Sequence, residues 1–427
     1  MKKTYLFTLL TIVTGISYGQ TPCANGRYSS DVYSTIDVTS NIVFGANASF
    51  NGANTTLDLD FYEPNGDTST ARPLIIFAHG GSFIGGTKTD PDIVTLCNRF
   101  AQKGFVCASI NYRVGMWPIT ATEATKAVLR AVQDMKASIR FFYQDRATTD
   151  TYKIDTTQIY VAGTSAGGIT AFHLAYLDKE CELEGYMTTT TLTALGGLEG
   201  TSGNPGYSTT IAGAIGMGGA LASYGWIETG DVPFCATHGT ADNVVPYNRG
   251  MASVAGIGII ELDGSRAMHG QADIVGVSNN FYSHYGAGHV PHVSNVNTMD
   301  TTVNFIRDFL IDNMGCTDAA LQAENTPLET VDFYDLTYCG LSVNSLAMTA
   351  VKRIYPNPSS DKMTIELENF EAVQTIQLFD LSGRIHQTYN ATSNVVTISK
   401  GNLDEGSYIL RTILTDGSST TNNVVFL

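Results

Sequence analysis

The stretch Gly163-Thr164-Ser165-Ala166-Gly167 decides the interpretation of this chain of 427 residues. Residues 158–162 (QIYVA) before it are mainly apolar and β-branched, which predicts a buried strand, and residues 168–176 (GITAFHLAY) after it predict a helix. A G-x-S-x-G serine between a strand and a helix is typical of a nucleophile at a sharp turn, where glycines let the two elements approach closely. We therefore predict Ser165 as a nucleophile and the backbone N–H of Ala166 as a donor to a developing oxyanion.

A second glycine-rich turn lies upstream. Residues 73–78 (PLIIFA) form a continuous apolar run, typical of a strand buried on both faces, and the run ends in His79-Gly80-Gly81. Glycines let the backbone come within hydrogen-bond distance of a substrate oxygen. We predict that Gly80 and Gly81 supply the other oxyanion donors through their N–H groups, and that His79 supports the loop.

Two further strands end beside side chains that could complete such a site. The strand predicted at 232–237 leads to Asp242, whereas the competing carboxylate, Asp231, precedes that strand and falls at the opposite edge of a sheet. The strand predicted at 280–285 leads through a Gly-rich loop to His289. We predict Asp242 as the orienting acid and His289 as the base.

Other histidines near these positions have alternative interpretations. His292 is the second candidate for the base, and His238 is interpreted as a structural residue under the turn that holds Asp242. His284, His289 and His292 could also be considered a metal cluster, but the spacing matches no known site and no carboxylate pattern accompanies it. We expect neither a metal nor a cofactor.

Buried strands alternate with amphipathic helices, which predicts an α/β fold, a doubly wound and mainly parallel sheet. Helices are expected at 90–103 and after a capping box that begins at Thr120. Residues 40–313 resemble the α/β-hydrolase fold, in the carboxylesterase group with an H-G-G oxyanion loop and a G-T-S-A-G elbow. The resemblance implies that Ser165 is the nucleophile, Asp242 its acid and His289 its general base.

Two segments of this region bear on the pocket. Related esterases carry a helical N-terminal cap, whereas residues 20–56 are polar and strand-like here, so we expect a more open pocket. Residues 177–211 are irregular and rich in glycine, and we interpret them as a loop that shapes the substrate site, or as a plain surface loop.

The domain organisation follows from changes in composition. Residues 1–19 have the basic start, apolar run and small residues of a secretory signal peptide. We expect a catalytic domain at 20–314, a linker at 315–350 and a β-sandwich at 351–427. No other apolar stretch is long enough to span a membrane, so we expect no transmembrane segment in the mature chain.

The last domain is predicted from short alternating strands at 363–367, 375–379, 395–398 and 408–412. Its segments YPNP (355–358), DLSGR (380–384) and GSYIL (406–410) resemble the C-terminal sorting domain of the type IX secretion system of Bacteroidetes-like bacteria. The resemblance implies export through the periplasm and a partner in the secretion machinery, which would leave the protein secreted or at the cell surface. A carbohydrate-binding or adhesive module is the alternative.

Composition, charge and cysteine content indicate the class of protein, the partners it excludes and the possible disulfides. Apolar residues make up 43% of the chain and charged residues 15%, as in globular proteins, and a net charge of −16 argues against nucleic acid partners. Among seven cysteines, Cys316 and Cys339 are the expected disulfide, and Cys97, Cys107 and Cys235 are expected to be buried thiols.

We thus expect a secreted serine carboxylic-ester hydrolase that forms an acyl-enzyme on Ser165. Export suggests substrates derived from polymers, either acetyl or feruloyl esters of polysaccharides or polyesters. A serine peptidase on the same fold and a non-catalytic surface binding protein are the alternatives.

Overall fold

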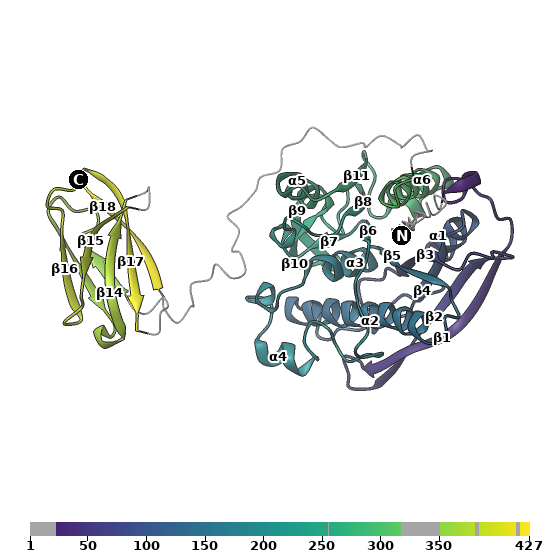
Figure 1. Ribbon diagram of the computed structural model, residues 1–427, viewed down its shortest axis with the longest axis horizontal. Coiled ribbons are helices and arrows are strands. Elements are labelled where there is room, and N and C mark those ends of the chain that lie inside the picture. The colour runs from purple at the N-terminus through teal and green to yellow at the C-terminus, as the bar shows by residue number, and fades with distance from the viewer. Residues whose placement is uncertain (1–22, 255, 317–350, 381–383, 416–418) are drawn as a thin grey trace, which may run out of the picture. The chain divides into compact units, whose positions relative to one another are not determined.

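The computed structural model describes residues 23–254, 256–316, 351–380, 384–415 and 419–427 (Figure 1). The chain divides into two compact units, residues 1–335 and residues 336–427. The predicted signal peptide, Cys339 and nearly all of the predicted linker lie outside the described residues. Within the described part of the chain, no helix combines the length and the apolar character needed to cross a membrane.

An eight-stranded sheet forms the centre of the first unit (Figure 1). Six neighbouring strands run parallel, β2 pairs antiparallel with β4, and β1 pairs antiparallel with β2 at the edge. In spatial order, the strands are β1 (Ile36–Ala48), β2 (Asn54–Pro64), β4 (Val106–Ile110), β3 (Arg72–Ala78), β5 (Ile154–Thr164), β6 (Gly213–Met217), β8 (Phe234–Gly239) and β11 (Asn279–His284). The predicted α/β-hydrolase sheet is confirmed.

Helices cover both faces of this sheet because the central parallel strands carry apolar side chains on both sides. Figure 1 shows α2 (Ala121–Ala147) and α3 (Ala166–Tyr176) on one side and α1 (Pro91–Gln102) and α6 (Val296–Asn313) on the other, and each pair packs on its own apolar cluster. The Thr120 side chain caps α2 by accepting a hydrogen bond from the Glu123 N–H, as its sequence predicts.

A second, three-stranded sheet lies beside the pocket described below and was not anticipated from the sequence. It has the order β7 (Ala220–Leu221), β10 (Ile257–Gly264), β9 (Arg249–Val254), with antiparallel pairing throughout. The remaining elements of this unit are short or terminal: α4 (Thr189–Ala194), α5 (Ser265–Val275), η1 (Ala24–Gly26), η2 (Glu180–Leu183), η3 (Tyr224–Trp226) and η4 (Pro291–Val293).

The cysteine pairing differs from the expectation. Cys316 is bonded to Cys23, so the predicted Cys316–Cys339 disulfide is wrong. The reason is that α6 returns the chain to the N-terminal segment, where both cysteines pack in the apolar cluster under α1 and α6, a proximity that sequence spacing does not report. Cys97, Cys107 and Cys235 are buried free thiols, as expected, and Cys181 is disulfide-bonded.

The second unit is a sandwich of two antiparallel sheets over one apolar core, as predicted. One sheet has the order β12 (Val351–Tyr355), β13 (Lys362–Leu367), β16 (Val395–Ser399). The other has the order β15 (Ile385–Tyr389), β14 (Val373–Phe379), β17 (Gly406–Leu414), β18 (Ser419–Phe426), and a single turn, η6 (Phe370–Ala372), precedes β14.

Candidate active site

Ser165 occupies the turn between β5 and α3 in a strained backbone conformation, with φ 56° and ψ −117°. Close packing explains the two glycines of the motif: a Cβ on Gly163 would lie 2.2 Å from the carbonyl carbon of Gly167, and a Cβ on Gly167 would lie 2.1 Å from the oxygen of Ala78. The Ser165 N–H donates to the carbonyl of Met217 at the end of β6, 2.8 Å away. The close packing of the two glycines and the hydrogen bond to Met217 together fix the position of Ser165.

The structure brings Ser165, His289 and Asp242 into one hydrogen-bonded chain. His289 Nε2 lies 2.7 Å from Ser165 Oγ, and His289 Nδ1 lies 2.6 Å from Asp242 Oδ2. Because a carboxylate only accepts, Nδ1–H donates to Asp242 and leaves Nε2 free to accept the serine proton. Each of the three residues follows the end of a parallel strand, which is why they meet at one edge of the sheet.

Asp242 is buried but remains a carboxylate. Its Oδ1 accepts hydrogen bonds from the N–H groups of Val244 and Val245, at 2.9 and 3.0 Å. Burial by itself would raise the pKa of Asp242, but hydrogen bonds from His238 and His289 outweigh it and hold that pKa well below its ordinary value. Asp242 therefore carries the negative charge that faces His289 at neutral pH.

His238 makes a contact that sequence reasoning missed. Its Nε2 lies 3.2 Å from Asp242 Oδ2, and its Nδ1 lies 2.8 Å from Ser265 Oγ, with the ring fully buried. The structure thus places His238 under the turn, as interpreted, and also in contact with the carboxylate. The signal for this contact was the four-residue spacing between His238 and Asp242.

The loop of Gly80 and Gly81 runs alongside Ser165. A Cβ on Gly80 would lie 3.5 Å from the Cβ of Ser165, and Gly81 has a φ of +107° with no room for a Cβ beside Gly85. Among the described residues, neither glycine N–H has a hydrogen-bond acceptor. Ala166 begins α3, where the first N–H groups have no acceptor within the helix.

His79 holds this loop from behind. Its ring stacks on Tyr112 with centroids 4.3 Å apart, and its Nδ1 lies 2.7 Å from the carbonyl oxygen of Gly80. Burial lowers the pKa of His79, which favours the neutral ring. The structure therefore places His79 as a support for the loop, away from His289 and its partners.

The alternative residues lie elsewhere. His292 is buried with Nε2 3.2 Å from Thr164 Oγ1, and His284 Nε2 lies 3.4 Å from Thr302 Oγ1. Asp231, at the other end of β8, accepts a hydrogen bond from the Glu228 N–H. Across the residues that the structure describes, no group of three or more His, Cys, Asp or Glu side chains could hold a metal ion.

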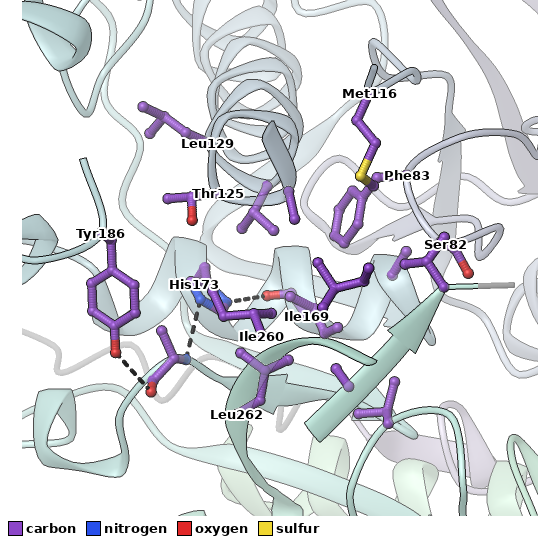
Figure 2. Close-up of a pocket in the computed structure, with 18 of the residues that line it drawn as sticks. Ser82, Phe83, Met116, Thr125, Leu129, Ile169, His173, Tyr186, Ile260 and Leu262 are labelled. Atoms are coloured by element: carbon purple, nitrogen blue, oxygen red, sulfur yellow. Dashed lines mark hydrogen bonds between the residues drawn. The ribbon is translucent and has the colours of Figure 1, made fainter. Parts of the chain in front are cut away.

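An apolar pocket, partly open to solvent, lies over α3 (Figure 2), and Ser165 is among the residues that line it. The irregular segment 177–211 contributes Leu177, Leu183 and Tyr186 to its lining. The second sheet contributes Ser253 and five apolar residues that we call the β9–β10 wall: Ala252, Val254, Ile259, Ile260 and Leu262. We expected a more open pocket because residues 20–56 lack a helical cap, and the sequence did not predict the β9–β10 wall, which lines it instead.

Comparisons with known proteins give the family of each unit. Residues 59–194 match the family described as BD-FAE, and residues 353–426 match the secretion system C-terminal sorting domain. The BD-FAE match runs from β2 to the end of α4, so it includes Ser165 and the Gly80 loop, whereas Asp242 and His289 follow it.

Individual proteins resemble this chain over only part of its length or at low sequence identity. Esterase LipC of Mycobacterium tuberculosis is 33% identical over 113 residues, which are 26% of this chain and 24% of LipC, so the chain spans about a quarter of that relative's length. Solved structures similar to this chain include Thermogutta terrifontis esterase 2 phosphorylated by paraoxon, at 21% identity and TM-score 0.48 over 67% of this chain and 96% of that one. The propionate-bound form gives 21% identity and TM-score 0.46 over 66% and 96%.

Proposed function

We propose that this protein is a secreted serine carboxylic-ester hydrolase that works through an acyl-enzyme on Ser165. The hydrogen-bonded chain from Ser165 through His289 to Asp242 carries the proposal, because it supplies a nucleophile, a base and a charge that orients the base. The BD-FAE match and the name of the relative, esterase LipC, support it.

In the first half of the reaction, Ser165 Oγ bonds to the ester carbonyl carbon while its proton passes to His289 Nε2. The carbonyl oxygen becomes an oxyanion and accepts hydrogen bonds from the N–H groups of Gly80, Gly81 and Ala166. The bond from carbon to the alcohol oxygen then breaks, and the alcohol leaves with the proton that His289 had taken. The product is an acyl ester of Ser165.

In the second half, water replaces the alcohol. His289 Nε2 takes a proton from water as the hydroxide oxygen bonds to the acyl carbon. The bond between that carbon and Ser165 Oγ breaks, the proton on His289 returns to the serine oxygen, and the acid is released. Asp242 stays ionised throughout and stabilises the imidazolium.

Two alternative functions differ in whether they need Ser165, His289 and Asp242. A serine peptidase would attack an amide with the same three side chains, and a binding protein would need no nucleophile. Polysaccharide acetyl or feruloyl esters and polyesters remain the predicted sources of substrate. We favour ester cleavage because the matched relative, LipC, is an esterase by name.

The test is a panel of p-nitrophenyl esters and aminoacyl-anilides assayed with the full chain and with Ser165→Ala. Ester cleavage that disappears in the variant supports the proposal. Preference for anilides would favour the peptidase, and no cleavage of either class would favour the binding protein.

We further propose that the type IX machinery recognises the sorting domain after the chain has crossed into the periplasm. The match of residues 353–426 to a secretion system sorting domain supports this route. The mature protein would then reach the medium or the cell surface.

A further inference from the structure

We propose that the apolar pocket is the acyl site of this enzyme and that it selects esters of uncharged fatty acids of medium length, with the β9–β10 wall and the Tyr186 end limiting the chain. The inference rests on the proposed function and names the substrate class of the same site. It departs from the predicted acetyl and feruloyl substrates.

The position of His289 assigns the pocket to the acyl group. The leaving alcohol must lie beside His289 Nε2, because that nitrogen gives it a proton. His289 does not line the pocket, whereas Ser165, Ala166 and Ser82 do. We therefore infer that the pocket holds the acyl group rather than the leaving alcohol.

The residues along one face of α3 indicate the length of acyl chain that the pocket can hold. Ser165, Ile169 and His173 follow one another at four-residue intervals, and all three line the pocket. A rise of about 1.5 Å per residue places the level of His173 about 12 Å along the helix from Ser165. An extended alkyl chain advances about 1.3 Å per carbon, since C–C bonds of about 1.5 Å meet at tetrahedral angles, so the pocket matches about six to ten carbons.

Figure 2 shows how the pocket is enclosed. Ser82 lies at one end and Tyr186 at the other, with Leu129 of α2 above α3, and Ile260 and Leu262 of β10 below it. Aromatic rings in contact form the Tyr186 end of the pocket. The Trp226 ring lies edge-on to the rings of His173 and Tyr186, with centroids 5.5 and 6.0 Å apart. The pocket is thus a channel with walls on several sides rather than a flat surface.

The chemistry of the lining excludes charged acyl groups, because no Asp, Glu, Lys or Arg is among its residues. His173 is the one titratable nitrogen base in the lining, and burial lowers its pKa to about 4, so the ring is neutral in ordinary buffers. Its Nδ1–H donates to the Ile169 carbonyl and its Nε2 accepts from the Ala222 N–H, while the Tyr186 hydroxyl donates to the Ala222 carbonyl. These polar atoms are therefore already satisfied by the protein.

An acetyl group would leave most of this channel unfilled. Each buried methylene contributes about 0.8 kcal/mol, so chains that reach toward Tyr186 gain affinity that acetate cannot. A methylene in an apolar enzyme pocket changes kcat/KM by about tenfold or more. The expected signature is a steep rise in kcat/KM with acyl length that ends when the channel is full.

The test compares two isomers, ethyl octanoate and octyl acetate, which have equal size and place the long chain on opposite sides of the ester. We expect kcat/KM for ethyl octanoate to exceed that for octyl acetate by about tenfold or more. A p-nitrophenyl series from acetate to palmitate should peak between six and ten carbons, as the length of about 12 Å along α3 requires. Equal rates for the isomers, or a peak at acetate, would overturn the inference while leaving the esterase proposal standing.

A variant tests the position of the far end. Ala222→Leu adds a side chain beside His173 and Tyr186, and we expect the ratio of octanoate to butyrate kcat/KM to fall about tenfold or more. The matched control is Ala53→Leu, at an exposed position before β2, which should leave the ratio unchanged. An unchanged ratio in Ala222→Leu, with a normal melting temperature, would contradict the assignment of the far end.

Binding of 1-octanol tests the pocket without any ester cleavage. The chain has two tryptophans, so in Trp117→Phe the fluorescence reports on Trp226 alone, and we expect a saturable change with 1-octanol that ethanol does not cause. A saturable change with no ester cleaved would sink the esterase proposal and keep the ligand class of the pocket. The absence of any saturable change would overturn the inference itself.

Discussion

Ser165 is the residue on which the proposed chemistry depends most directly. Ser165→Ala removes the attacking oxygen and leaves the backbone turn in place, so we expect ester hydrolysis to fall by about 10⁴-fold or more. The measurement is kcat/KM on p-nitrophenyl butyrate, with the melting temperature as a check on folding. Turnover close to that of the wild type would end the serine mechanism.

Substitutions of the two neighbouring histidines, His289 and His292, should have clearly different effects on activity. His289→Ala should be about as damaging as Ser165→Ala, because nucleophile and base act as one unit. His292→Ala should cost far less activity, since its Nε2 faces Thr164 rather than the serine hydroxyl. Steady-state kinetics on both variants decides the matter, and the opposite ranking would assign the base to His292.

Glu182 gives the protein a pH-dependent stability. Burial raises its pKa to about 7 from an ordinary 4.5, against hydrogen bonds from the N–H groups of Lys179 and Asp178. The unfolded chain ionises first as the pH rises, so stability falls between pH 4.5 and 7. In Glu182→Gln, which keeps an acceptor oxygen, the melting temperature should fall less over this interval. An identical pH profile for both proteins would remove Glu182 as the cause.

Among the elements, the turn from β5 to α3 should tolerate substitution least. Gly163→Ala would place a Cβ 2.2 Å from the backbone of Gly167, and we expect a loss of about 1–3 kcal/mol in the free energy of unfolding together with lower activity. Gly258→Ala is the matched control, because its Cβ would meet only ordinary contacts at 3.6 Å. Denaturant unfolding of both variants measures the difference, and equal stabilities would contradict the close packing of the turn.

Elements with a strong hydrophobic pattern could be predicted, and elements without one could not. The apolar run at 73–78 became β3 and the capped segment after Thr120 became α2, because burial on both faces and a capped apolar stripe are local signals. The strands β6, β9 and β10 carry neither a continuous apolar run nor a clean alternation. The structure forms β6 and β10 through pairing with distant strands, and β9 pairs with β10. The pocket wall was missed for this reason.

The site was easier to predict than its pocket. Ser165, Asp242 and His289 each follow a strand, and parallel strands bring such positions to one edge, so their proximity follows from topology. Their catalytic roles stay predictions. The Cys23–Cys316 bond depends on the proximity of two cysteines far apart in the chain, which no spacing rule contains.

For the whole molecule, the sorting domain should control the destination and not the chemistry. A chain ending at residue 350 keeps Ser165, Asp242 and His289 and all seven cysteines, so we expect it to fold and hydrolyse esters normally. In the native host it should stop in the periplasm, whereas the full chain should appear outside the cell or on its surface. Fractionation with an antibody to the first unit measures this, and normal external amounts of the short form would refute the sorting role.

The Cys23–Cys316 bond also turns the hydrolase into a covalent circle. Every strand of the eight-stranded sheet, together with Ser165, Asp242 and His289, lies between the two bonded cysteines. A protease that cuts one exposed loop inside the circle therefore opens it without releasing a fragment. If the proposed secreted hydrolase meets proteases outside the cell, nicked molecules should stay in one piece and separate on a gel only after reduction.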